Sequence, residues 1–461
     1  MSGLVGVSEK RVHLIGIGGS GLSAIARVLL ERGAVVSGSD LTMSPAAVAL
    51  RRDGVLVSLG HAANNVNGAD IVVVSSAVPE DNVEIQRARA SGIPVVRRPE
   101  FLGQLMEGTR GIAVAGTHGK TTTTAMIASI LLSAGRDPTF VVGGVLAGLN
   151  TNARAGNEPL FVVEADEYDR TFLSLRPEVA VITNVEHDHP DCYPTFDDCR
   201  AAFDTFIKLV PETGLLVLCW DDPVARQMAE REVGQTPVAT FGLLEGAAWR
   251  AEEIRPNLAG GVDFLAVRNR TTLGLMRMRI PGAHNASNAM AALAVTDYLG
   301  VPLPTARQAL TDFRGVARRF EIKGQADGVT VVDDYAHHPT EILATLKATK
   351  ERFPDSRLWV VWQPHTHSRT KTLLEQFGAS FGKADRVIIL PIYEARETEV
   401  LGISIDDVLG VMVHDHVQAA ASLEEALVWL GTEVRPGDVV LTLGAGDGYQ
   451  VGEWLLQLLS P

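Results

Sequence analysis

A glycine-rich loop between a short apolar strand and a helical stretch occurs twice in this chain, and it constrains the fold more than any other sequence feature. The first loop lies in HLIGIGGSG at residues 13–21, and the second lies in VAGTHGKTTTT at residues 114–124. Loops of this kind bind phosphate through backbone N–H groups at the start of a helix, and they belong to parallel β-α-β units. The chain is therefore expected to contain two separate anion-binding units.

Apolar runs alternate with helix-like stretches along most of the chain, which is typical of parallel α/β sheets. The N-terminal part contains VHLIGIG, AVVSGSD, ADIVVVSSAV and IPVVR, and the C-terminal part contains VTVVDDY, LWVVWQP, DRVIILPIY and DVVLTLGAG. Between them, GVDFLAVRNRTTLGLMRMRIPG predicts antiparallel hairpins appended to a parallel sheet. We predict three consecutive α/β domains, at residues 1–108, 109–315 and 316–461, of which the outer two are Rossmann-like and the central one is of the P-loop type.

The charge and composition exclude several classes of protein. The formal net charge is −14, so broad binding to nucleic acid or to an anionic membrane is not expected, because such binding needs clustered Lys and Arg. An apolar run of about 18 residues, which a membrane span needs, is not apparent. The three cysteines show no C-x-x-C spacing and cannot all pair within one chain, which is typical of a reducing compartment. We expect a cytoplasmic protein without a secretory signal.

The first loop has the spacing of a dinucleotide-binding fingerprint. Gly16 is expected to allow a tight turn, Gly18 the approach of a diphosphate, and Gly21 the close packing of helix on strand. Asp40 ends the next strand, where an acidic side chain can bind a ribose hydroxyl. The motif indicates a diphosphate and a ribose but not a nicotinamide, so an NAD-type site and a plain glycine turn both remain open.

The second loop, residues 116–124, predicts a nucleoside triphosphate site. It follows a strand at Gly111–Ala115 and precedes a helix at Ala125–Leu132. Lys120 can reach the β- and γ-phosphates, and the hydroxyl of Thr121 can bind Mg²⁺. The loop is shorter than a standard Walker A loop, but a strand, G-K-T-T and a helix in this order indicate a functional site.

Acidic and histidine side chains follow two apolar strands of the same region, in VVEADEYD and TNVEHDHPD. The carboxyl ends of parallel strands meet at one edge of a sheet, and Mg²⁺ prefers oxygen ligands. The candidate side chains at this edge are Glu164, Asp166, Glu167, Glu186, His187, Asp188, His189 and Asp191.

A series of segments along the chain resembles the Mur ligase family, in the family's own order. The segments are GIGGSGLSAIA, VVSSAV, GTHGKTTTT, EADEYDRTFL, TNVEHDHPD, GAHNASNAMAA, FRGVARRFE, VDDYAHHPTEI, QPHTHSRT and LGAGDGY. The resemblance implies an ATP-dependent ligase of peptidoglycan precursor synthesis, which joins L-alanine to the lactyl carboxylate of UDP-N-acetylmuramate through an acyl phosphate. It implies that residues 1–108 bind the UDP-sugar, residues 109–315 bind ATP and Mg²⁺, and residues 316–461 bind the amino acid and cover ATP.

Carried over residue by residue, the resemblance implies four groups of site residues. The UDP-sugar is bound by Gly16, Gly18, Gly19, Ser20, Gly21, Asp40, Ser75 and Ser76. ATP is bound by Gly116, Thr117, His118, Gly119, Lys120, Thr121, Thr122, Asn285, Asn288 and Arg319. The magnesium ligands are Thr121, Glu164 and His189. The amino acid is bound by Tyr335, His337, His338 and Arg369.

The resemblance also implies catalytic roles. Lys120 and Arg319 stabilise the phosphates during transfer, and Asp334 or His337 accepts the proton of the incoming amine. Thr366 stands where some relatives have an arginine, which leaves open how the carboxylate of the amino acid is bound. Other relatives carry a carbamylated lysine near a second magnesium, and here Lys208 is interpreted as an ordinary surface lysine.

Three other functions remain open on the sequence. An NAD-dependent dehydrogenase accounts for the first loop but leaves the second loop and the acidic strand ends without a role. A GTP-dependent switch is disfavoured because no N-K-x-D segment is apparent. A sister ligase that joins a preformed murein peptide to the same nucleotide sugar is the nearest alternative. The preference among alanine, glycine and serine, any feedback regulation, and the state as monomer or homodimer are also open.

Overall fold

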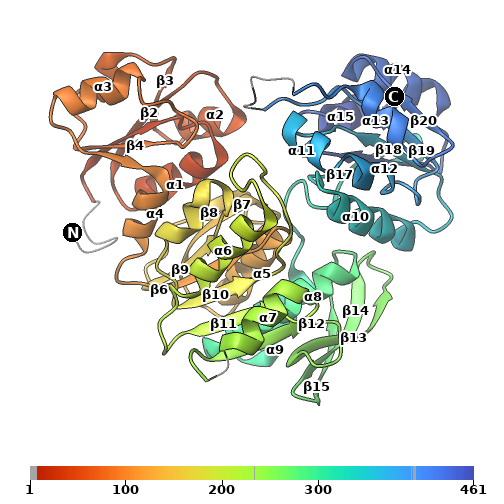
Figure 1. Cartoon of the computed structure of the whole chain (residues 1–461), viewed down its shortest axis with the longest axis horizontal. Helices are drawn as coiled ribbons and strands as arrows, with labels where there is room; N and C mark the ends of the chain where they lie inside the picture. The colour runs from red at the N-terminus through yellow and green to blue at the C-terminus, as the bar shows by residue number, and fades with distance from the viewer. Residues whose placement is uncertain (1–7, 233, 396, 398–400, 461) are drawn as a thin grey trace.

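Three β-sheets follow one another along the chain in the computed structural model, which describes residues 8–232, 234–395, 397 and 401–460. The N-terminal and C-terminal sheets lie on either side above the central sheet (Figure 1). The expected α/β class with three consecutive units is confirmed. Among the described residues, no helix combines the length and apolar character needed to cross a bilayer.

The N-terminal sheet is parallel, with the Rossmann-like strand order β3-β2-β1-β4-β5. Its strands are β1 (Arg11–Ile15), β2 (Val35–Asp40), β3 (Leu56–Leu59), β4 (Ile71–Val74) and β5 (Val95–Arg97). The helices that join them or follow them are α1 (Ser20–Glu31), α2 (Pro45–Arg52), η2 (Ala63–Val66), α3 (Val83–Ala90) and α4 (Arg98–Met106). The first glycine-rich loop therefore lies between β1 and α1, as its sequence predicts.

The central sheet has the order β15-β14-β13-β12-β11-β10-β6-β9-β7-β8. Its strands are β6 (Arg110–Ala115), β7 (Thr139–Leu146), β8 (Thr151–Arg154), β9 (Leu160–Glu164), β10 (Val179–Ile182), β11 (Leu215–Cys219), β12 (Val238–Gly242), β13 (Trp249–Pro256), β14 (Val262–Arg268) and β15 (Thr271–Arg277). Its helices are α5 (Lys120–Ser133), η3 (Tyr168–Ser174), α6 (Phe196–Ile207), α7 (Pro223–Glu232), α8 (Ala283–Tyr298) and α9 (Leu303–Asp312).

Antiparallel strands close both edges of the central sheet. The predicted hairpins are present, since β14 pairs antiparallel with β13 and with β15. At the opposite edge β7 and β8 form a hairpin that the apolar pattern did not predict. The helix after the second loop begins at Lys120 and not at Ala125, so the run of threonines belongs to the first turns of α5.

The C-terminal sheet has the order β16-β17-β21-β18-β19-β20, with β16 antiparallel to the rest. Its strands are β16 (Glu321–Ala326), β17 (Val329–Asp334), β18 (Leu358–Trp362), β19 (Arg386–Ile389), β20 (Val417–Ala419) and β21 (Val439–Leu443). Its helices are α10 (Pro339–Arg352), α11 (His367–Thr372), α12 (Leu374–Gly378), α13 (Ile405–Val411), α14 (Leu423–Glu433) and α15 (Tyr449–Leu459). In Figure 1, α10 lies on the side of this sheet that faces the central unit.

The apolar cores divide the molecule unequally. One continuous core joins α1 of the N-terminal unit to the central sheet, with Leu29 and Phe140 both fully buried in it. The C-terminal sheet has its own cores, one on each face, built around Trp362 and Trp359. The N-terminal and central units are thus held together by apolar packing, whereas the C-terminal unit is a separate apolar body.

We expect Phe206→Ala to lower the free energy of unfolding of the central unit by about 3–5 kcal/mol, because it removes a fully buried ring and leaves a cavity. The ring of Phe206 stacks on Phe172 with centroids 4.8 Å apart. Urea unfolding measures the loss, and Leu258→Ala, at a fully exposed turn, is the control with a change within about 0.5 kcal/mol. Equal losses in the two variants would contradict this packing.

Candidate active site

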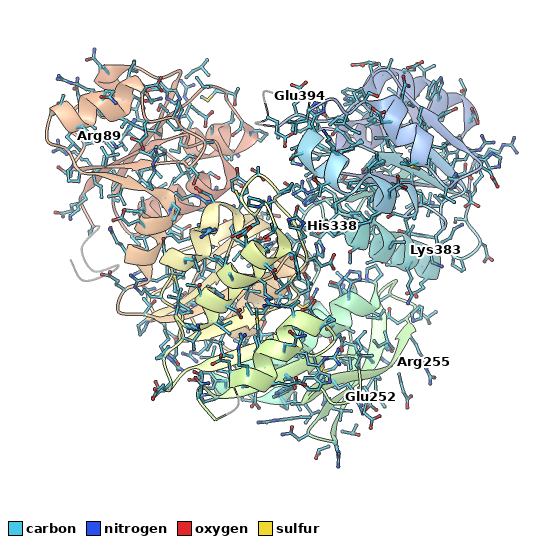
Figure 2. The ribbon with its side chains drawn as sticks, viewed as in Figure 1. Arg89, Glu252, Arg255, His338, Lys383 and Glu394 are labelled. Carbon is cyan, nitrogen blue, oxygen red and sulfur yellow. The ribbon has the colours of Figure 1, made fainter. Side chains whose placement is uncertain are left out.

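All three units line one cavity of about 480 Å³. The N-terminal unit contributes Ser20 and Arg98, the central unit Lys120, and the C-terminal unit His337 and Arg369. The loops that carry these residues follow the carboxyl ends of parallel strands, where ligands bind in open α/β sheets. Figure 2 shows His338 where the C-terminal unit meets the central unit.

A second, smaller cavity of about 170 Å³ lies between the central and C-terminal units. Asn285 and Asn288, from the start of α8, lie on it together with Arg319 and Asp334. Burial lowers the pKa of the neighbouring His284 to about 4, so its ring is neutral and offers a flat, uncharged surface. A neutral, partly apolar wall of this kind suits a nucleobase, and the cavity opens towards the second glycine-rich loop through Gly119 and Thr121.

The second loop is held in shape by glycine conformations and by the adjacent strand. Gly119 has φ of +81°, and a Cβ there would lie 2.8 Å from Oδ1 of Asn288. The backbone N–H of His118 donates to Oδ1 of Asn184 at 2.8 Å, which ties the loop to the end of β10. The loop therefore presents its remaining N–H groups and the start of α5 to the cavity.

Lys120 is folded back onto its own loop. Its Nζ donates to the carbonyl oxygen of Gly116 at 2.6 Å and lies 2.8 Å from Oε2 of Glu167. Burial acts to lower the pKa of Lys120, but the carboxylates of Glu167, Asp166 and Glu164 outweigh burial and raise it. Lys120 is therefore a charged cation at the wall of the large cavity.

The predicted magnesium ligands meet in this cavity. The hydroxyl of Thr121 donates to Oε1 of Glu164 at 2.9 Å, and Glu164 also accepts from the backbone N–H of Gly143 at 2.6 Å. His189 lines the same cavity. Carboxylate and hydroxyl oxygens from adjacent strand ends fit a hard divalent cation such as Mg²⁺.

The acidic strand ends do not form one cluster. Asp166 and Asp188 lie in the large cavity with Glu164 and His189. Glu186 instead faces the ring of His118, with Oε2 3.6 Å from Nε2. The ring nitrogen Nε2 of His187 lies 2.9 Å from the carbonyl oxygen of Tyr193, which is a structural contact.

The first loop is supported by Asp40 in a way that the sequence did not predict. Oδ2 of Asp40 accepts a hydrogen bond from the backbone N–H of Gly18 at 2.9 Å, so this carboxylate holds the loop in addition to facing any ligand. A Cβ at Gly18 would lie 2.8 Å from Oγ of Ser44, which explains the glycine. Gly21 was expected to allow close packing of the helix on the strand. It instead makes room for the side chain of Arg98, since a Cβ at Gly21 would lie 2.7 Å from Nη1 of Arg98.

The other predicted residues of the UDP-sugar site surround this loop. Ser20 begins α1 after Gly19, and Gly16 turns the chain with φ of +86°. The hydroxyl of Ser76 is buried and has no hydrogen-bond partner within the part of the chain that the structure describes. Ser75 packs against Gly16.

Arg369 is buried at the other end of the large cavity. Its Nε donates to Oδ1 of Asp188 at 2.8 Å, and its Nη1 donates to the carbonyl oxygen of His365 at 2.8 Å. Thr366 donates through Oγ1 to Oε1 of Glu397 at 2.6 Å. Arg369 thus lines the cavity as a charged guanidinium beside a buried carboxylate.

His337 lies next to Arg369 in the cavity and is neutral. Its Nδ1 lies 2.9 Å from the carbonyl oxygen of Tyr335, which makes Nδ1 the protonated nitrogen and leaves Nε2 as an acceptor. Burial lowers the pKa of His337 to about 3. The ring of Tyr335 is contacted by the guanidinium groups of Arg318 and Arg319, each 5.0 Å from its centroid.

Asp334 accepts two backbone hydrogen bonds, and the pKa of its carboxyl is raised. It accepts from the backbone N–H groups of Phe320 at 2.7 Å and Ala336 at 2.8 Å. Burial raises the pKa of Asp334 to about 6, against the opposing effect of Arg319. Its carboxylate is thus poised to change protonation near neutral pH.

Glu341 is a site residue that the sequence reading missed. One of its oxygens lies 3.2 Å from Nδ1 of His118 and 3.6 Å from Nη1 of Arg319, and the other accepts from the backbone N–H of His337 at 3.0 Å. Burial acts to raise the pKa of this carboxyl, but the positive charges of His118 and Arg319 hold it well below its usual range. The sequence feature that could have indicated Glu341 is its position in HHPTE, in the first turn of α10.

Two further residues lie at the boundaries between units. Arg98 was also missed, and its Nη2 lies 3.7 Å from Oδ2 of Asp166, which links the N-terminal unit to the acidic strand end. His338 caps α10 by accepting from the backbone N–H of Thr340 at 3.3 Å and lies beside Glu186. Its predicted role at the amino acid stays a prediction. Lys208 is exposed at the end of α6, as interpreted.

Family models match nearly the whole chain. They are the Mur ligase family, catalytic domain, at residues 11–110, the Mur ligase middle domain at residues 114–296, and the Mur ligase, glutamate ligase domain at residues 318–446. The UDP-N-acetylmuramate–L-alanine ligase of Roseiflexus sp. (strain RS-1) is 46% identical over 97% of this chain and 98% of that protein. The ligase of the same name from Geobacter sp. (strain M21) is 46% identical over 98% of each chain.

Solved structures agree with these matches. The UDP-N-acetylmuramate-alanine ligase of Thermotoga maritima superimposes with a TM-score of 0.82 at 30% identity, over 97% of this chain and 98% of that chain. A murein peptide ligase from Psychrobacter arcticus superimposes with a TM-score of 0.73 at 28% identity, over 98% of each chain. With this likeness along its whole length, the chain belongs to the Mur ligase family.

Proposed function

We propose that the protein is an ATP-dependent ligase that joins L-alanine to the lactyl carboxylate of UDP-N-acetylmuramate, a step of peptidoglycan precursor synthesis. The observation that carries the proposal is the single cavity lined by all three units, in which an anion loop, a triphosphate loop and a buried guanidinium face one another. Relatives of 46% identity that carry this activity in their names support it.

We assign one substrate to each unit. Residues 1–108 bind the UDP-sugar through the loop around Gly18, residues 109–315 bind ATP through the loop around Lys120, and residues 316–461 bind L-alanine through Arg369. The buried, unpaired hydroxyl of Ser76 supports the first assignment, and the neutral wall at His284 supports the second. Arg369 supports the third, because a guanidinium can grip a carboxylate with two parallel hydrogen bonds.

The order of the chemical steps follows from the reactivity of a carboxylate. A carboxylate does not react with an amine in water because its oxygen is a poor leaving group. A lactyl oxygen therefore attacks the γ-phosphorus of ATP, ADP leaves, and an acyl phosphate forms. The amine of L-alanine then attacks the acyl carbon, and phosphate leaves as the amide bond forms. The first step brings anions together, so Lys120 and Arg319 offset the repulsion.

Magnesium fits the same cavity. We assign it to Thr121, Glu164 and His189, whose oxygen-rich donor set suits Mg²⁺. When bound, the ion neutralises phosphate charge. The hydroxyl of Thr121 and the backbone N–H of Gly143 hold the carboxylate of Glu164 in place.

The proton of the amine goes to a group of the C-terminal unit. Asp334 is ionised above a pKa of about 6, and Nε2 of His337 is an unprotonated acceptor at neutral pH. Asp334 lines the smaller cavity, and His337 lines the large cavity together with Arg369. We favour Asp334 because its acidity lies nearer the working pH, which is where general bases act most efficiently.

A ligase that joins a preformed peptide to the same nucleotide sugar is the second candidate, because a murein peptide ligase shares the fold at 28% identity. Phosphate release, measured with UDP-N-acetylmuramate and ATP against L-alanine, glycine, L-serine and the murein tripeptide, decides between the two. We expect the fastest turnover with L-alanine. Turnover with the tripeptide alone would reassign the protein to the second activity, and NADH formation would exclude both.

Lys120→Ala is expected to lower kcat by about 100-fold or more, because it removes a preorganised cation from the phosphates. Coupled ADP-release assays measure the effect. The matched control is Lys208→Ala, at the exposed end of α6, which should retain the activity of the original protein. Circular dichroism checks that the variant folds with Glu167 unpaired. A folded Lys120→Ala variant with near-full kcat would refute the role of Lys120.

The pH profile of kcat is expected to fall on the acid side below about pH 6, because protonation of Asp334 removes the proton acceptor. The activity is therefore present above this pKa and is lost as the pH falls through it. Asp334→Asn should lower kcat and abolish this acid limb, whereas Asp355→Asn, at an exposed position after α10, should keep it. An unchanged limb in Asp334→Asn would reject the assignment.

A further inference from the structure

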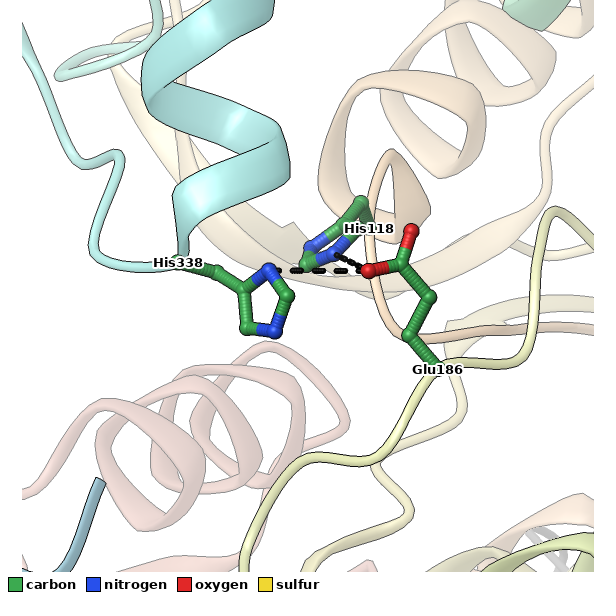
Figure 3. A group of neighbouring side chains, drawn as sticks. All are labelled: His118, Glu186 and His338. Atoms are coloured by element: carbon green, nitrogen blue, oxygen red, sulfur yellow. Dashed lines mark ion pairs between the residues drawn. The ribbon is translucent and has the colours of Figure 1, made fainter. Parts of the chain in front are cut away.

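Two histidines and a glutamate meet where the nucleotide loop faces the start of α10, outside the set assigned to magnesium. They are His118 of the loop, Glu186 after β10, and His338 at the cap of α10 (Figure 3). Oε2 of Glu186 lies 3.6 Å from Nε2 of His118 and 3.6 Å from Nδ1 of His338. The ligand atoms of all three lie within 4.8 Å of one another.

We propose that His118, Glu186 and His338 form a binding site for Zn²⁺ that joins the central unit to the C-terminal unit. In a tetrahedral site with ligands at about 2.0–2.2 Å, ligand atoms lie about 3.3 Å apart. Each histidine nitrogen therefore needs to approach the glutamate oxygen by only a few tenths of an ångström. The two histidines come closer by side-chain rotation, in which Nδ1 of His338 gives up its 3.3 Å contact with the backbone N–H of Thr340 to bind the metal. A water completes four-coordination.

One ring nitrogen of the cluster faces a carboxylate from beyond hydrogen-bond distance. Nε2 of His118 is buried and makes no hydrogen bond within the described ranges of the chain, and Oε2 of Glu186 lies 3.6 Å away. The nitrogen points towards Glu186 in Figure 3, and this contact leaves a buried polar atom poorly satisfied. A metal ion between the two side chains would be bound by Nε2 and by the carboxylate.

The surroundings of His118 match the outer partners of a metal site. Its other nitrogen, Nδ1, lies 3.2 Å from Oε1 of Glu341. Histidines that bind metals donate their second ring N–H to a carboxylate in this way, which fixes the ring and the tautomer. Oε2 of Glu186 is also held, because it accepts from the hydroxyl of Thr340 at 2.7 Å.

The site has an entry path of its own. Glu186 and His338 line a cavity of about 270 Å³ together with Phe196 and Gln376. His118 lines the nucleotide cavity on the other side. A metal ion can therefore reach the ligands without passing through the ATP site. An entry path is one of the requirements of a metal site.

The ligand chemistry favours zinc over magnesium. Two imidazole nitrogens and one carboxylate suit Zn²⁺, whereas Mg²⁺ prefers oxygen ligands and retains several waters. The magnesium site assigned to Thr121, Glu164 and His189 offers two oxygen ligands and one imidazole, whereas the zinc site offers two imidazoles and one carboxylate, so the two sites differ in their preferred ion. Zinc at this point links the nucleotide loop to the first turn of α10.

Titration calorimetry with ZnCl2 in millimolar Mg²⁺ tests the site on the full chain. We expect one tight zinc site in the original protein. Glu186→Gln keeps the shape and the bond to Thr340, and His338→Asn keeps a capping side chain, so both should fold. Each should weaken zinc binding at least about 100-fold, beyond the loss that an outer partner alone causes. His416→Ala, at an exposed position, should bind as the original protein does.

Anomalous diffraction at the zinc edge locates the ion directly. A peak between the three side chains supports the proposal. A peak elsewhere, zinc binding unaffected by Glu186→Gln and His338→Asn, or failure of the original protein to bind zinc would each overturn it. Ligase activity is measured separately, so a chain that joins L-alanine but binds no zinc refutes this inference and leaves the proposed function intact.

Discussion

Each cation that faces the reacting groups lies beside a buried carboxylate, and the rest of the site depends on this constraint. Lys120 lies against Glu167, and Arg369 donates to Asp188. A buried charge without a partner costs several kcal/mol, so the protein supplies the partners itself. Cations held in this way stay charged and oriented before ATP arrives. The chain can therefore carry a net charge of −14 and still bind two nucleotides through local groups.

Glu341 extends the same principle across the boundary between two units. It belongs to α10, yet it contacts His118 of the nucleotide loop as well as Arg319 and the backbone of His337. The loop assigned to ATP, a cation assigned to its phosphates and a group assigned to the amino acid all contact this one carboxylate. A substitution at His118, Arg319 or His337 is expected to affect the other two, because the buried carboxylate of Glu341 cannot lose one partner without a free-energy cost.

The sequence predicted those parts of the site that lie within one strand–loop–helix unit. The loops around Gly18 and Lys120, and the acidic ends of β9 and β10, were found because each signal is local. Glu341 and Arg98 were missed because their roles come from contacts across units, and a local pattern carries no record of these. The hairpin of β7 and β8 was missed for another reason, since its register is broken by an irregularity between Val141 and Leu146.

The distribution of apolar and polar contacts determines which unit can move. The N-terminal unit shares a continuous apolar core with the central sheet, so separating them exposes apolar surface to water. Described contacts of the C-terminal unit with the central unit include exposed polar ones, such as the hydrogen bond from Thr340 to Glu186. An exposed polar group exchanges a protein partner for water at a small net cost. The buried pair of Arg369 and Asp188 opposes separation, because breaking it leaves a buried charge without a partner. We infer that the C-terminal unit is the one that moves, since its separation exposes less apolar surface than separation of the N-terminal unit.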